Sequence, residues 1–401
     1  MNESFWAKLK MVKGRDLCSF FLFLLAILPA AVLKRIRPGL WLICEQGTEA
    51  RDNGYWFFRY LRTEHPAVDA VYAIDRNSPE YQKVASLGPT VQQGSLKHWI
   101  YYLACRVNVS SMKQGKPNAA IGYLLEVLLG IVNPCFVFLQ HGIIKDDIPS
   151  LHKEKCAFSL FICGAEPEYD YVKSTFGYEE GVVCYTGLAR FDGLYGIKAD
   201  TDLVLIVPTW RMYLHRKGDA LSAEEFQKTA YYKAWSSLLA DGRLDALLAK
   251  YGKRAVFCLH RNMEAFEGYF ASSSERIRVV PWQQADIGSL LRNAGHMITD
   301  YSSVAMDFAY MKKPLAYYQF DQEEFRAGHL PTGYFDYQRD GFGPVCTGED
   351  ALLQALEKIF AGDTSGEEYL RRIDSFYTIR DDQNCRRIYD AACEMLKKQR
   401  R

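Results

Sequence analysis

Short apolar runs alternate with amphipathic stretches along almost the whole chain, and this alternation limits the possible folds more than any other feature. Buried parallel strands are continuous apolar runs, and the helices that connect them have one apolar face. In Gly54–Leu61 and Leu96–Ala104 the apolar residues recur at helical spacing. The runs form two sets, so the sequence predicts two Rossmann-like α/β units. The predicted strands are Trp41–Cys44, Val68–Ile74, Arg106–Val109, Cys135–Leu139, Phe158–Cys163 and Val182–Tyr185, then Leu203–Val207, Ala255–Leu259, Arg278–Val280, His296–Ile298 and Leu315–Tyr318.

The connection Gly193–Asp202, with glycine, lysine and aspartate, separates the two sets of runs. We therefore expect an N-terminal segment over residues 1–37, an N-terminal domain over residues 38–197 and a C-terminal domain over residues 198–401. The charged, helical region Tyr369–Lys398 belongs to the last part, and the sequence leaves open whether it packs back across the first unit.

Composition and missing motifs exclude several classes of protein. The 49 basic residues nearly balance the 48 acidic ones, so no overall positive field attracts nucleic acid. The dinucleotide fingerprint GxGxxG and the phosphate loop GxxxxGK[ST] are absent, which argues against nicotinamide enzymes and P-loop NTPases. HExxH and spaced Cys/His clusters are also absent, so no metal site is indicated. The 11 cysteines are odd in number and form no CxxC pair, as expected for a cytosolic protein.

The segment Leu17–Leu33 is uncharged and strongly apolar, and basic residues flank it on both sides. Its 17 residues lie at the lower limit for crossing a bilayer. We expect a membrane-associating helix that lies in the anionic cytoplasmic leaflet, while its cations reach the headgroups. A transmembrane helix, a cleaved signal peptide and a buried helix remain open. The flanking cations are Lys8, Lys10, Lys13, Arg15, Lys34, Arg35 and Arg37.

Conspicuous polar residues directly follow predicted strands. In open parallel sheets, ligands bind beyond the carboxyl ends of the strands, where loops converge and helix N-termini point inward. These residues are therefore expected to face one cleft. The segments are Gln140-His141-Gly142, Leu188-Ala189-Arg190, Pro208-Thr209-Trp210-Arg211, His260-Arg261 and Thr299-Asp300-Tyr301-Ser302-Ser303.

In the second unit the polar segments predict a phosphate site. Ser302 and Ser303 precede a helical pattern that has no capping-box glutamate, so free amides and hydroxyls at the helix N-terminus suit a phosphate. The alternative is an ordinary serine-capped helix in which Asp307 bonds back to Ser303. His260-Arg261 adds a titratable donor and a bidentate cation, or else is a surface pair on a loop. The remaining candidates for donor phosphates are Thr209, Arg211 and Asp300, although Pro208–Arg211 also fits a plain turn with an aromatic plug.

In the first unit His141 is the candidate general base, because a histidine titrates near neutral pH and can deprotonate an alcohol. Gly142 beside it permits close approach of a substrate. A lone histidine at a strand end is more often structural, and that alternative remains open. The further candidates for the acceptor or the cleft are Arg51, Asn53, Gln140 and Arg190, although Arg51–Gly54 also fits a plain Asn-capped helix start.

Taken together, these residues resemble the CDP-glycerol glycerophosphotransferase family of wall teichoic acid and capsule synthesis. The resemblance runs from Trp41 to Ile388 in the family's order and spacing. Besides the residues named above, it includes Glu45, Asp52, Tyr55, Thr186, Gly187, Phe191, Asp192, Asp307 and the segment Pro314–Asp321.

The resemblance implies a GT-B fold, with the donor nucleotide held mainly by the second unit and the acceptor by the first. It implies transfer of glycerol phosphate from CDP-glycerol to a hydroxyl of a lipid-linked saccharide or polymer, with release of CMP, at the cytoplasmic face of a bacterial membrane. His141 would be the base, and His260, Arg261, Ser302 and Ser303 would engage the pyrophosphate. Fixed cations and a helix N-terminus would stabilise the transferred group, so no metal or cofactor is expected.

Three alternatives remain. CDP-ribitol would share every nucleotide and pyrophosphate contact. A GT-B glycosyltransferase would need sugar-binding carboxylates where the chain has Asp300-Tyr301-Ser302-Ser303. A non-enzymatic membrane scaffold would not need His141 and His260. The short distance between the apolar segment and the first strand leads us to expect a priming or short-chain transferase.

Overall fold

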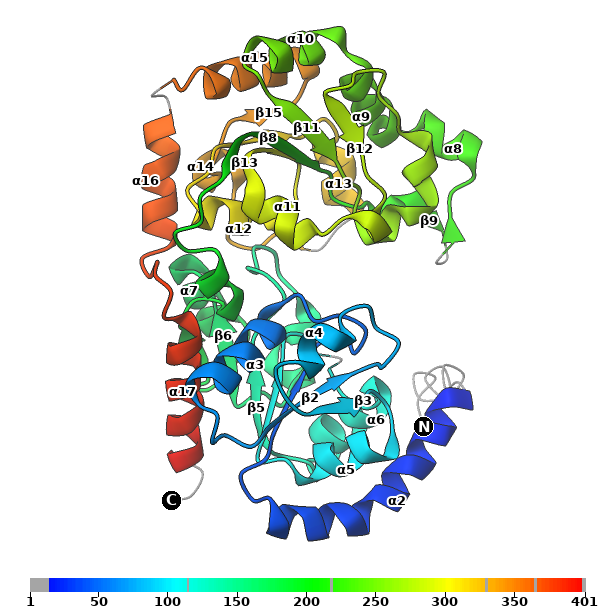
Figure 1. Cartoon of the computed structure of the whole chain (residues 1–401), viewed down its shortest axis with the longest axis vertical. Helices are drawn as coiled ribbons and strands as arrows, with labels where there is room; N and C mark the ends of the chain where they lie inside the picture. The colour runs from blue at the N-terminus through cyan, green and yellow to red at the C-terminus, as the bar shows by residue number, and fades with distance from the viewer. Residues whose placement is uncertain (1–13, 114, 217–218, 329–330, 364–365, 399–401) are drawn as a thin grey trace. The chain divides into compact units, whose positions relative to one another are not determined.

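The computed structural model describes residues 14–113, 115–216, 219–328, 331–363 and 366–398 (Figure 1). The chain divides into two compact units, each built from separate stretches of sequence. The first contains the residues up to His141, Pro149–Gly193 and the residues from Asp381 onward. The second contains Gly142–Ile148 and Leu194–Arg380. The chain therefore passes between the units after Gly193, shortly before the predicted boundary at residue 197. Gly142–Ile148 and the residues from Asp381 onward lie in the opposite unit to the predicted one, because these stretches pack on the other sheet's unit.

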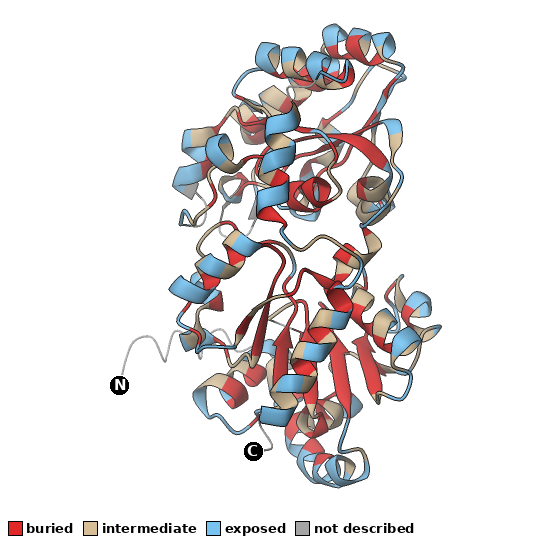
Figure 2. Cartoon of the chain, turned by 90° about the vertical axis from the view of Figure 1, so that its left-hand side faces the viewer, coloured by how far each residue is buried: buried red, intermediate tan, exposed pale blue. Residues whose placement is uncertain are grey.

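The first unit holds a seven-stranded parallel sheet in the order β3-β2-β1-β4-β5-β6-β7. Most of its strands are fully buried, which explains their continuous apolar runs (Figure 2). Its strands are β1 (Trp41–Cys44), β2 (Ala70–Ile74), β3 (Thr90–Gln92), β4 (Val107–Ser110), β5 (Cys135–Phe138), β6 (Leu160–Cys163) and β7 (Val183–Tyr185). All six predicted strands are confirmed. Sequence reasoning missed β3, because Val91 is the only buried residue of this short strand.

The second unit holds a six-stranded parallel sheet in the order β12-β11-β8-β13-β14-β15, and a small antiparallel hairpin of β9 and β10. The strands are β8 (Asp200–Val207), β9 (His215–Arg216), β10 (Asp219–Ala220), β11 (Arg254–Phe257), β12 (Ile277–Val279), β13 (Ala294–Thr299), β14 (Leu315–Tyr318) and β15 (Val345–Cys346). The five predicted strands are confirmed, whereas β9, β10 and β15, of two residues each, were missed.

Helices connect the strands in both units. The first unit has α2 (Gly14–Ile36), α3 (Asn53–Glu64), α4 (Tyr81–Ala85), α5 (Leu96–Ala104), α6 (Ala119–Tyr123), the π-helix η1 (Leu124–Leu128), η2 (Pro149–Leu151), η3 (Lys153–Lys155), α7 (Glu166–Thr175), η4 (Ala189–Gly193) and α17 (Asn384–Lys398). The second has η5 (Met212–Leu214), α8 (Ala223–Lys228), α9 (Ala230–Ala240), α10 (Gly242–Lys250), η6 (Arg261–Tyr269), η7 (Trp282–Gln284), α11 (Ile287–Asn293), α12 (Val304–Tyr310), α13 (Gln322–Gly328), α14 (Tyr337–Asp340), α15 (Glu349–Phe360) and α16 (Glu367–Phe376).

The last helix, α17, packs on the first unit beside α3, β5 and β6 (Figure 1). The Asp192 carboxylate fixes its start by accepting from the backbone N–H groups of Asn384 at 2.8 Å and Cys385 at 2.9 Å. Gly187 has a φ of +78°, and a Cβ there would lie 1.8 Å from Oδ1 of Asn384. The Thr186 carbonyl accepts from Arg387 Nε at 2.8 Å. Thr186, Gly187 and Asp192, which belong to the family resemblance, therefore hold the C-terminal helix on the first unit.

One side of α2 packs along α5. Phe23 and Ala26 are buried there, the rings of Phe23 and Trp99 lie 5.6 Å apart, and Trp99 Nε1 donates to Ser19 Oγ at 3.2 Å. The stretch Asp16–Ile36 is long and apolar enough to cross a membrane, with a mean hydropathy of 2.3 in its best window. Its other side exposes Leu17, Phe20, Phe21, Leu24, Leu25, Ile27, Leu28, Val32 and Ile36. The predicted basic flank Lys8, Lys10 and Lys13 lies outside the described residues.

Each sheet has a point where the strand order reverses. This point lies between β1 and β4 in the first sheet and between β8 and β13 in the second. The loops beyond such points diverge and leave room for a ligand. The polar segments that follow β1, β8 and β13 therefore occupy the ligand-binding position of each sheet.

Candidate active site

In the first unit, His141 and Asp52 form a hydrogen-bonded pair. His141 follows β5 and Asp52 precedes α3, and His141 Nδ1 lies 2.6 Å from Asp52 Oδ2. The His141 side chain is 68% exposed, whereas that of Asp52 is 13% exposed. An imidazole anchored by a largely covered carboxylate is thus presented at the surface of the unit.

The electrostatics of this pair favour a general base. The charge of Asp52 and its hydrogen bond raise the pKa of His141. Burial would raise the pKa of Asp52, but the attraction of His141 and Arg190 outweighs it and the pKa is lowered. An ionised carboxylate can only accept, so Nδ1 of the neutral ring carries the proton and Nε2 keeps its lone pair. Nε2 is therefore able to take a proton from a hydroxyl.

Hydrogen bonds from Arg190 and Asn53 hold the His141–Asp52 pair in place. Arg190 Nη1 donates to Asp52 Oδ1 at 2.8 Å and to the carbonyl oxygen of His141 at 2.6 Å. Asn53 Nδ2 donates to the carbonyl of Gln140 at 2.8 Å, and Asn53 Oδ1 accepts from the N–H of Arg190 at 2.9 Å. Because Asn53 is fully buried, the prediction that it contacts the acceptor is replaced by a supporting role.

Gln140 also points inward, contrary to the prediction of a ligand contact. It is buried, and its amide donates to the carbonyl of Ile162 and, at 3.1 Å, to Glu168. Its φ of +62° is rare for a residue other than glycine. This left-handed turn separates the inward Gln140 from the exposed His141 that follows it.

The two other residues that were predicted to lie in the first unit, Arg51 and Gly142, are placed differently. Arg51 Nε donates to Glu80 Oε1 at 2.9 Å, and its side chain is 40% exposed. Gly142 is half-buried and belongs to the second unit. The sequence analysis included Asp52 in the family resemblance but gave it no role in the site, although a carboxylate at the start of a helix beside a strand end is a recognisable signal.

In the second unit, Arg211 forms a buried cluster of ion pairs with Asp300 and Asp321, which we call the lock, instead of a surface for the donor. The side chains of Arg211 and Asp300 are fully buried, and Arg211 Nη2 lies 2.9 Å from Asp300 Oδ2. Arg211 also donates to Asp321 from Nε at 2.8 Å and from Nη2 at 3.0 Å. The prediction that the side chains of Arg211 and Asp300 contact donor phosphates is therefore wrong in this structure, because both are buried and paired with each other's charge.

The lock joins the loops that follow β8 and β13. Asp300 Oδ1 accepts from the N–H groups of Thr209 at 2.8 Å and Tyr301 at 2.6 Å. Arg211 Nη1 donates to the carbonyl of Thr209 at 2.8 Å. The Thr209 hydroxyl is buried and has no hydrogen-bond partner among the described residues. Thr209 therefore remains a candidate that a ligand could satisfy.

His260 has the opposite hydrogen-bonding pattern to His141. Its Nδ1 accepts from the N–H of Asn262 at 3.1 Å, so Nε2 carries the proton in the neutral ring. Its ring centroid lies 6.5 Å from that of Trp210 and 6.1 Å from that of Trp282. Arg261 follows as an exposed residue at the start of η6. This strand end thus offers a hydrogen-bond donor beside a cation.

Ser302 and Ser303 lie at the start of α12. Ser303 is the N-cap residue, but its side chain makes no capping hydrogen bond. Ser302 Oγ accepts from the N–H of Val304 at 3.4 Å. The alternative of an ordinary helix capped by the Ser303 side chain is therefore not what the structure shows.

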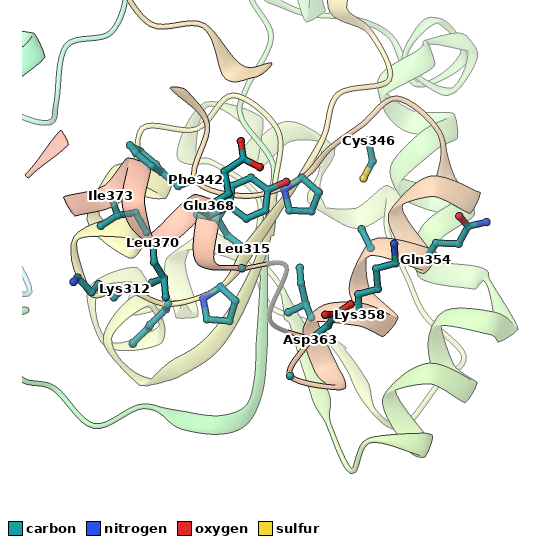
Figure 3. A pocket seen from close by; sticks show the side chains of 18 of the residues that line it. Lys312, Leu315, Phe342, Cys346, Gln354, Lys358, Asp363, Glu368, Leu370 and Ile373 are labelled. Carbon is teal, nitrogen blue, oxygen red and sulfur yellow. The ribbon is translucent and has the colours of Figure 1, made fainter. Parts of the chain in front are cut away.

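Two of the cavities in the described part of the second unit are sizeable. One of about 590 Å³ has a lining that includes Glu264, Glu267 and Gln283 of η6 and η7, and it contains no predicted site residue. The other, of about 570 Å³, lies between α15, α16 and the start of β14 and contains no predicted site residue (Figure 3). Among the described residues, no group of three or more His, Cys, Asp and Glu side chains is arranged to hold a metal ion.

Curated relatives of the chain act in teichoic acid synthesis. The minor teichoic acid biosynthesis protein GgaB of Bacillus subtilis is 28% identical over 381 residues, which make up 90% of this chain and 40% of GgaB. The teichoic acid glycerol-phosphate transferase of Staphylococcus aureus is 33% identical over 107 residues, 26% of each chain. The match therefore spans less than half the length of either relative.

Solved structures show the same fold. The wall teichoic acid polymerase TagF superposes with a TM-score of 0.65 at 16% identity, over 97% of this chain and 100% of the TagF chain. Staphylococcus aureus MnaA, solved with UDP, gives a TM-score of 0.55 at 12% identity, over 89% of this chain and 96% of its own. The likeness to TagF confirms the predicted GT-B class of two parallel-sheet units.

The family comparison covers most of the candidate residues. The model of the family described as CDP-Glycerol:Poly(glycerophosphate) glycerophosphotransferase matches residues 170–394. That stretch contains Arg190, Thr209, His260, Arg261 and Ser302. Since the match extends over more than half of the chain, the protein belongs to the CDP-glycerol glycerophosphotransferase family.

Proposed function

We propose that the chain transfers glycerol phosphate from CDP-glycerol to a hydroxyl of a lipid-linked saccharide or growing polymer and releases CMP. The observation that carries the proposal is the pair of histidines with opposite tautomers. His141 offers a lone pair on Nε2, as a base requires, and His260 offers a proton on Nε2, as a developing phosphate anion requires. A TagF structure solved with CDPG supports this choice of donor.

The chemical step needs only these groups and two substrates. His141 Nε2 takes the proton of the acceptor hydroxyl, whose oxygen attacks the phosphorus that carries glycerol. The bond from this phosphorus to the bridging oxygen breaks, and CMP leaves with the electron pair. His260 and Arg261 donate hydrogen bonds to the departing phosphate, and the Ser302 and Ser303 hydroxyls hold the pyrophosphate. No metal or cofactor is assigned a step.

The experiment that tests the function measures nucleotide release by the purified chain with a lipid-linked disaccharide acceptor, as CMP from a CDP-alditol and as UDP from a nucleotide sugar. CDP-glycerol, CDP-ribitol and UDP-N-acetylglucosamine are offered in parallel. We expect release from CDP-glycerol alone. Release from CDP-ribitol alone would keep the mechanism and change the donor, and turnover of the nucleotide sugar would contradict the proposal.

CDP-ribitol is the second candidate donor because a ribitol-phosphate polymerase is also a relative. TarL of Staphylococcus aureus is 24% identical over 237 residues, 56% of this chain and 39% of its own length. The matching family model and the Staphylococcus aureus glycerol-phosphate transferase, at 33% identity, both name glycerol, and we therefore place glycerol first.

Replacing Arg261 by alanine should weaken donor binding. An arginine that bonds a phosphate contributes about 1.5–3 kcal/mol, so the Kd for CDP-glycerol is expected to rise about tenfold to a hundredfold. Arg276→Ala is the matched control. This arginine lies at the amino end of β12, whereas Arg261 lies beyond the carboxyl end of the neighbouring strand β11, and its side chain is 48% exposed. Titration calorimetry that gives equal affinities for both variants would rule out a phosphate contact of Arg261.

We further propose that α2 rests on the cytoplasmic leaflet and does not cross it. Its packing along α5 covers one side with protein, whereas its exposed apolar side can enter the lipid. Lys34 and Arg35 in its last turn suit anionic headgroups.

The double variant Leu25→Glu, Leu28→Glu tests this surface, because these side chains are 64% and 78% exposed. We expect that the double variant no longer binds phosphatidylglycerol vesicles in a flotation assay, while its turnover of a soluble acceptor is unchanged. Leu370→Glu, at a leucine of the second unit that is 42% exposed, is the control and should still float. Undiminished flotation of the double variant would show that α2 is not the anchor.

A further inference from the structure

Helix α3 begins without the hydrogen bond that its N-cap residue normally supplies. An aspartate at this position usually accepts from the N–H of the second or third helical residue. Asp52 is the N-cap residue of α3, yet its side chain makes no such bond. Its two oxygens face His141 and Arg190 instead. Another acceptor must therefore satisfy the helix N-terminus.

Glu45 supplies that acceptor from the carboxyl end of β1. The residue is buried, and its Oε1 accepts from the N–H groups of Tyr55 at 2.6 Å and Asp52 at 3.2 Å. Its Oε2 accepts from the N–H of Arg51 at 3.2 Å. Tyr55 is the third residue of α3, so Glu45 takes the bond that the Asp52 side chain would otherwise make.

The glycine at position 54 leaves room for the Glu45 carboxyl group beside the helix. A Cβ at Gly54 would lie 2.8 Å from Cγ of Glu45 and 3.0 Å from its Oε1, so only glycine fits here without displacing the carboxyl group. The N–H of Gly54 donates to Ser111 Oγ at 2.7 Å, just beyond β4. The start of α3 is thus capped from the ends of two neighbouring strands.

We propose that Glu45 is a positioning residue that caps α3 in place of Asp52 and thereby keeps the Asp52 carboxylate on Nδ1 of His141. The importance of this geometry for turnover rests on the proposed function, in which His141 is the base. The capping itself does not depend on the reaction.

The charges around Glu45 agree with this division of roles. Burial, and then the charge of Asp52, raise the pKa of Glu45, whereas the pKa of Asp52 is lowered. Burial also raises the pKa of the other titratable neighbours, Tyr72 and Cys44, which are therefore neutral. Since two adjacent buried charges repel, the proton resides on Glu45 and the charge on Asp52 beside His141.

Three substitutions separate capping from charge. Glu45→Ala removes the acceptor, Glu45→Asp keeps a carboxyl group but withdraws it by one methylene, and Glu45→Gln keeps an oxygen in place without a charge. If position matters, Glu45→Ala and Glu45→Asp are impaired and Glu45→Gln is close to the wild type. If charge matters, Glu45→Gln is impaired and Glu45→Asp is not.

The readouts are kcat, the KM for CDP-glycerol and the pKa of His141 from ¹³C-histidine NMR, its signal identified by its loss in His141→Gln. In Glu45→Ala and Glu45→Asp we expect Asp52 to turn to the helix, so the pKa of His141 falls towards that of an ordinary histidine. Misplacement of the base should lower kcat about tenfold to a hundredfold with KM unchanged. Glu45→Gln should stay within about threefold of the wild type.

Ser95→Ala is the matched control. Ser95 caps α5 in the same unit by accepting from the N–H of His98 at 3.1 Å, and it has no contact with His141. Ser95→Ala removes a helix cap of similar energy, about 1 kcal/mol of stability, and should change neither kcat nor the pKa of His141.

A wild-type His141 pKa and kcat in Glu45→Ala and Glu45→Asp would overturn the proposal, even if both proteins are less stable. Should Glu45→Ala fail to fold, Gly54→Ala replaces it, because the added methyl group displaces Glu45 while keeping its carboxyl group. If the pKa of His141 falls as expected but the wild type transfers nothing from CDP-glycerol, the proposed function fails and the capping role stands.

Discussion

Replacing His141 by alanine should lower kcat for glycerol phosphate transfer by about 10²–10⁴, the usual contribution of a general base. Its Nδ1 is held by Asp52 at 2.6 Å, and its side chain is 68% exposed, so Nε2 is available to an acceptor hydroxyl. The affinity for CDP-glycerol should be nearly unchanged, because the donor candidates belong to the second unit. Steady-state CMP release gives kcat, and titration calorimetry gives the donor affinity.

His65→Ala is the control for this variant. His65 belongs to the same unit, and its ring stacks on Tyr389 at 3.9 Å. It follows a helix and not a strand end, so its loss should leave kcat unaltered. A His141→Ala protein that keeps more than about a tenth of the wild-type kcat would remove His141 as the base.

The pH dependence of the wild-type rate checks the same assignment. A base acts in its neutral form, so kcat/KM should rise with pH through the pKa of His141. Asp52 raises that pKa, and the rise is therefore expected above the ordinary histidine value of about 6.5. A rise centred below this value would mean that Asp52 does not hold the imidazole during turnover.

The fold and the strand-end positions of the candidate residues could be predicted because both follow from local patterns. Continuous apolar runs mark buried parallel strands, and polar residues directly after them lie at the carboxyl edge. Pairing between distant residues has no such local signal. Asp52 and His141 are 89 positions apart, and the sequence therefore did not reveal that they meet.

The same limit explains why Arg211 was misassigned. An arginine after a strand gives the same sequence pattern whether it binds a phosphate or neutralises buried carboxylates. Here the partner Asp321 is 110 positions away. Gln140 shows the limit within one motif, since it and His141 are adjacent at the same strand end, yet one is buried and the other exposed.

Replacing Arg211 by methionine should destabilise the second unit by about 3–5 kcal/mol, one of the largest effects expected from a single substitution in this chain. Methionine keeps much of the volume but leaves Asp300 and Asp321 as buried carboxylates without their cation. The desolvation of two charges is then no longer offset by an ion pair. The rings of Tyr301 and Phe325, each 4.9 Å from the guanidinium, lose a cation–π partner as well.

Hydrogen exchange can localise this loss, which a single unfolding midpoint of a two-unit protein cannot. Amides of β8 and β13 should exchange faster in Arg211→Met, because the lock joins the loops that follow these strands, whereas amides of β1 and β4 should not change. Arg243→Met is the control, since Arg243 also contacts carboxylates, Asp241 and Asp350, but is 60% exposed. Water and salt already screen its ion pairs, so its loss should matter far less. Equal exchange in both variants would mean that the buried lock does not stabilise the second sheet, and that Arg211 is again free to be considered a ligand for the donor.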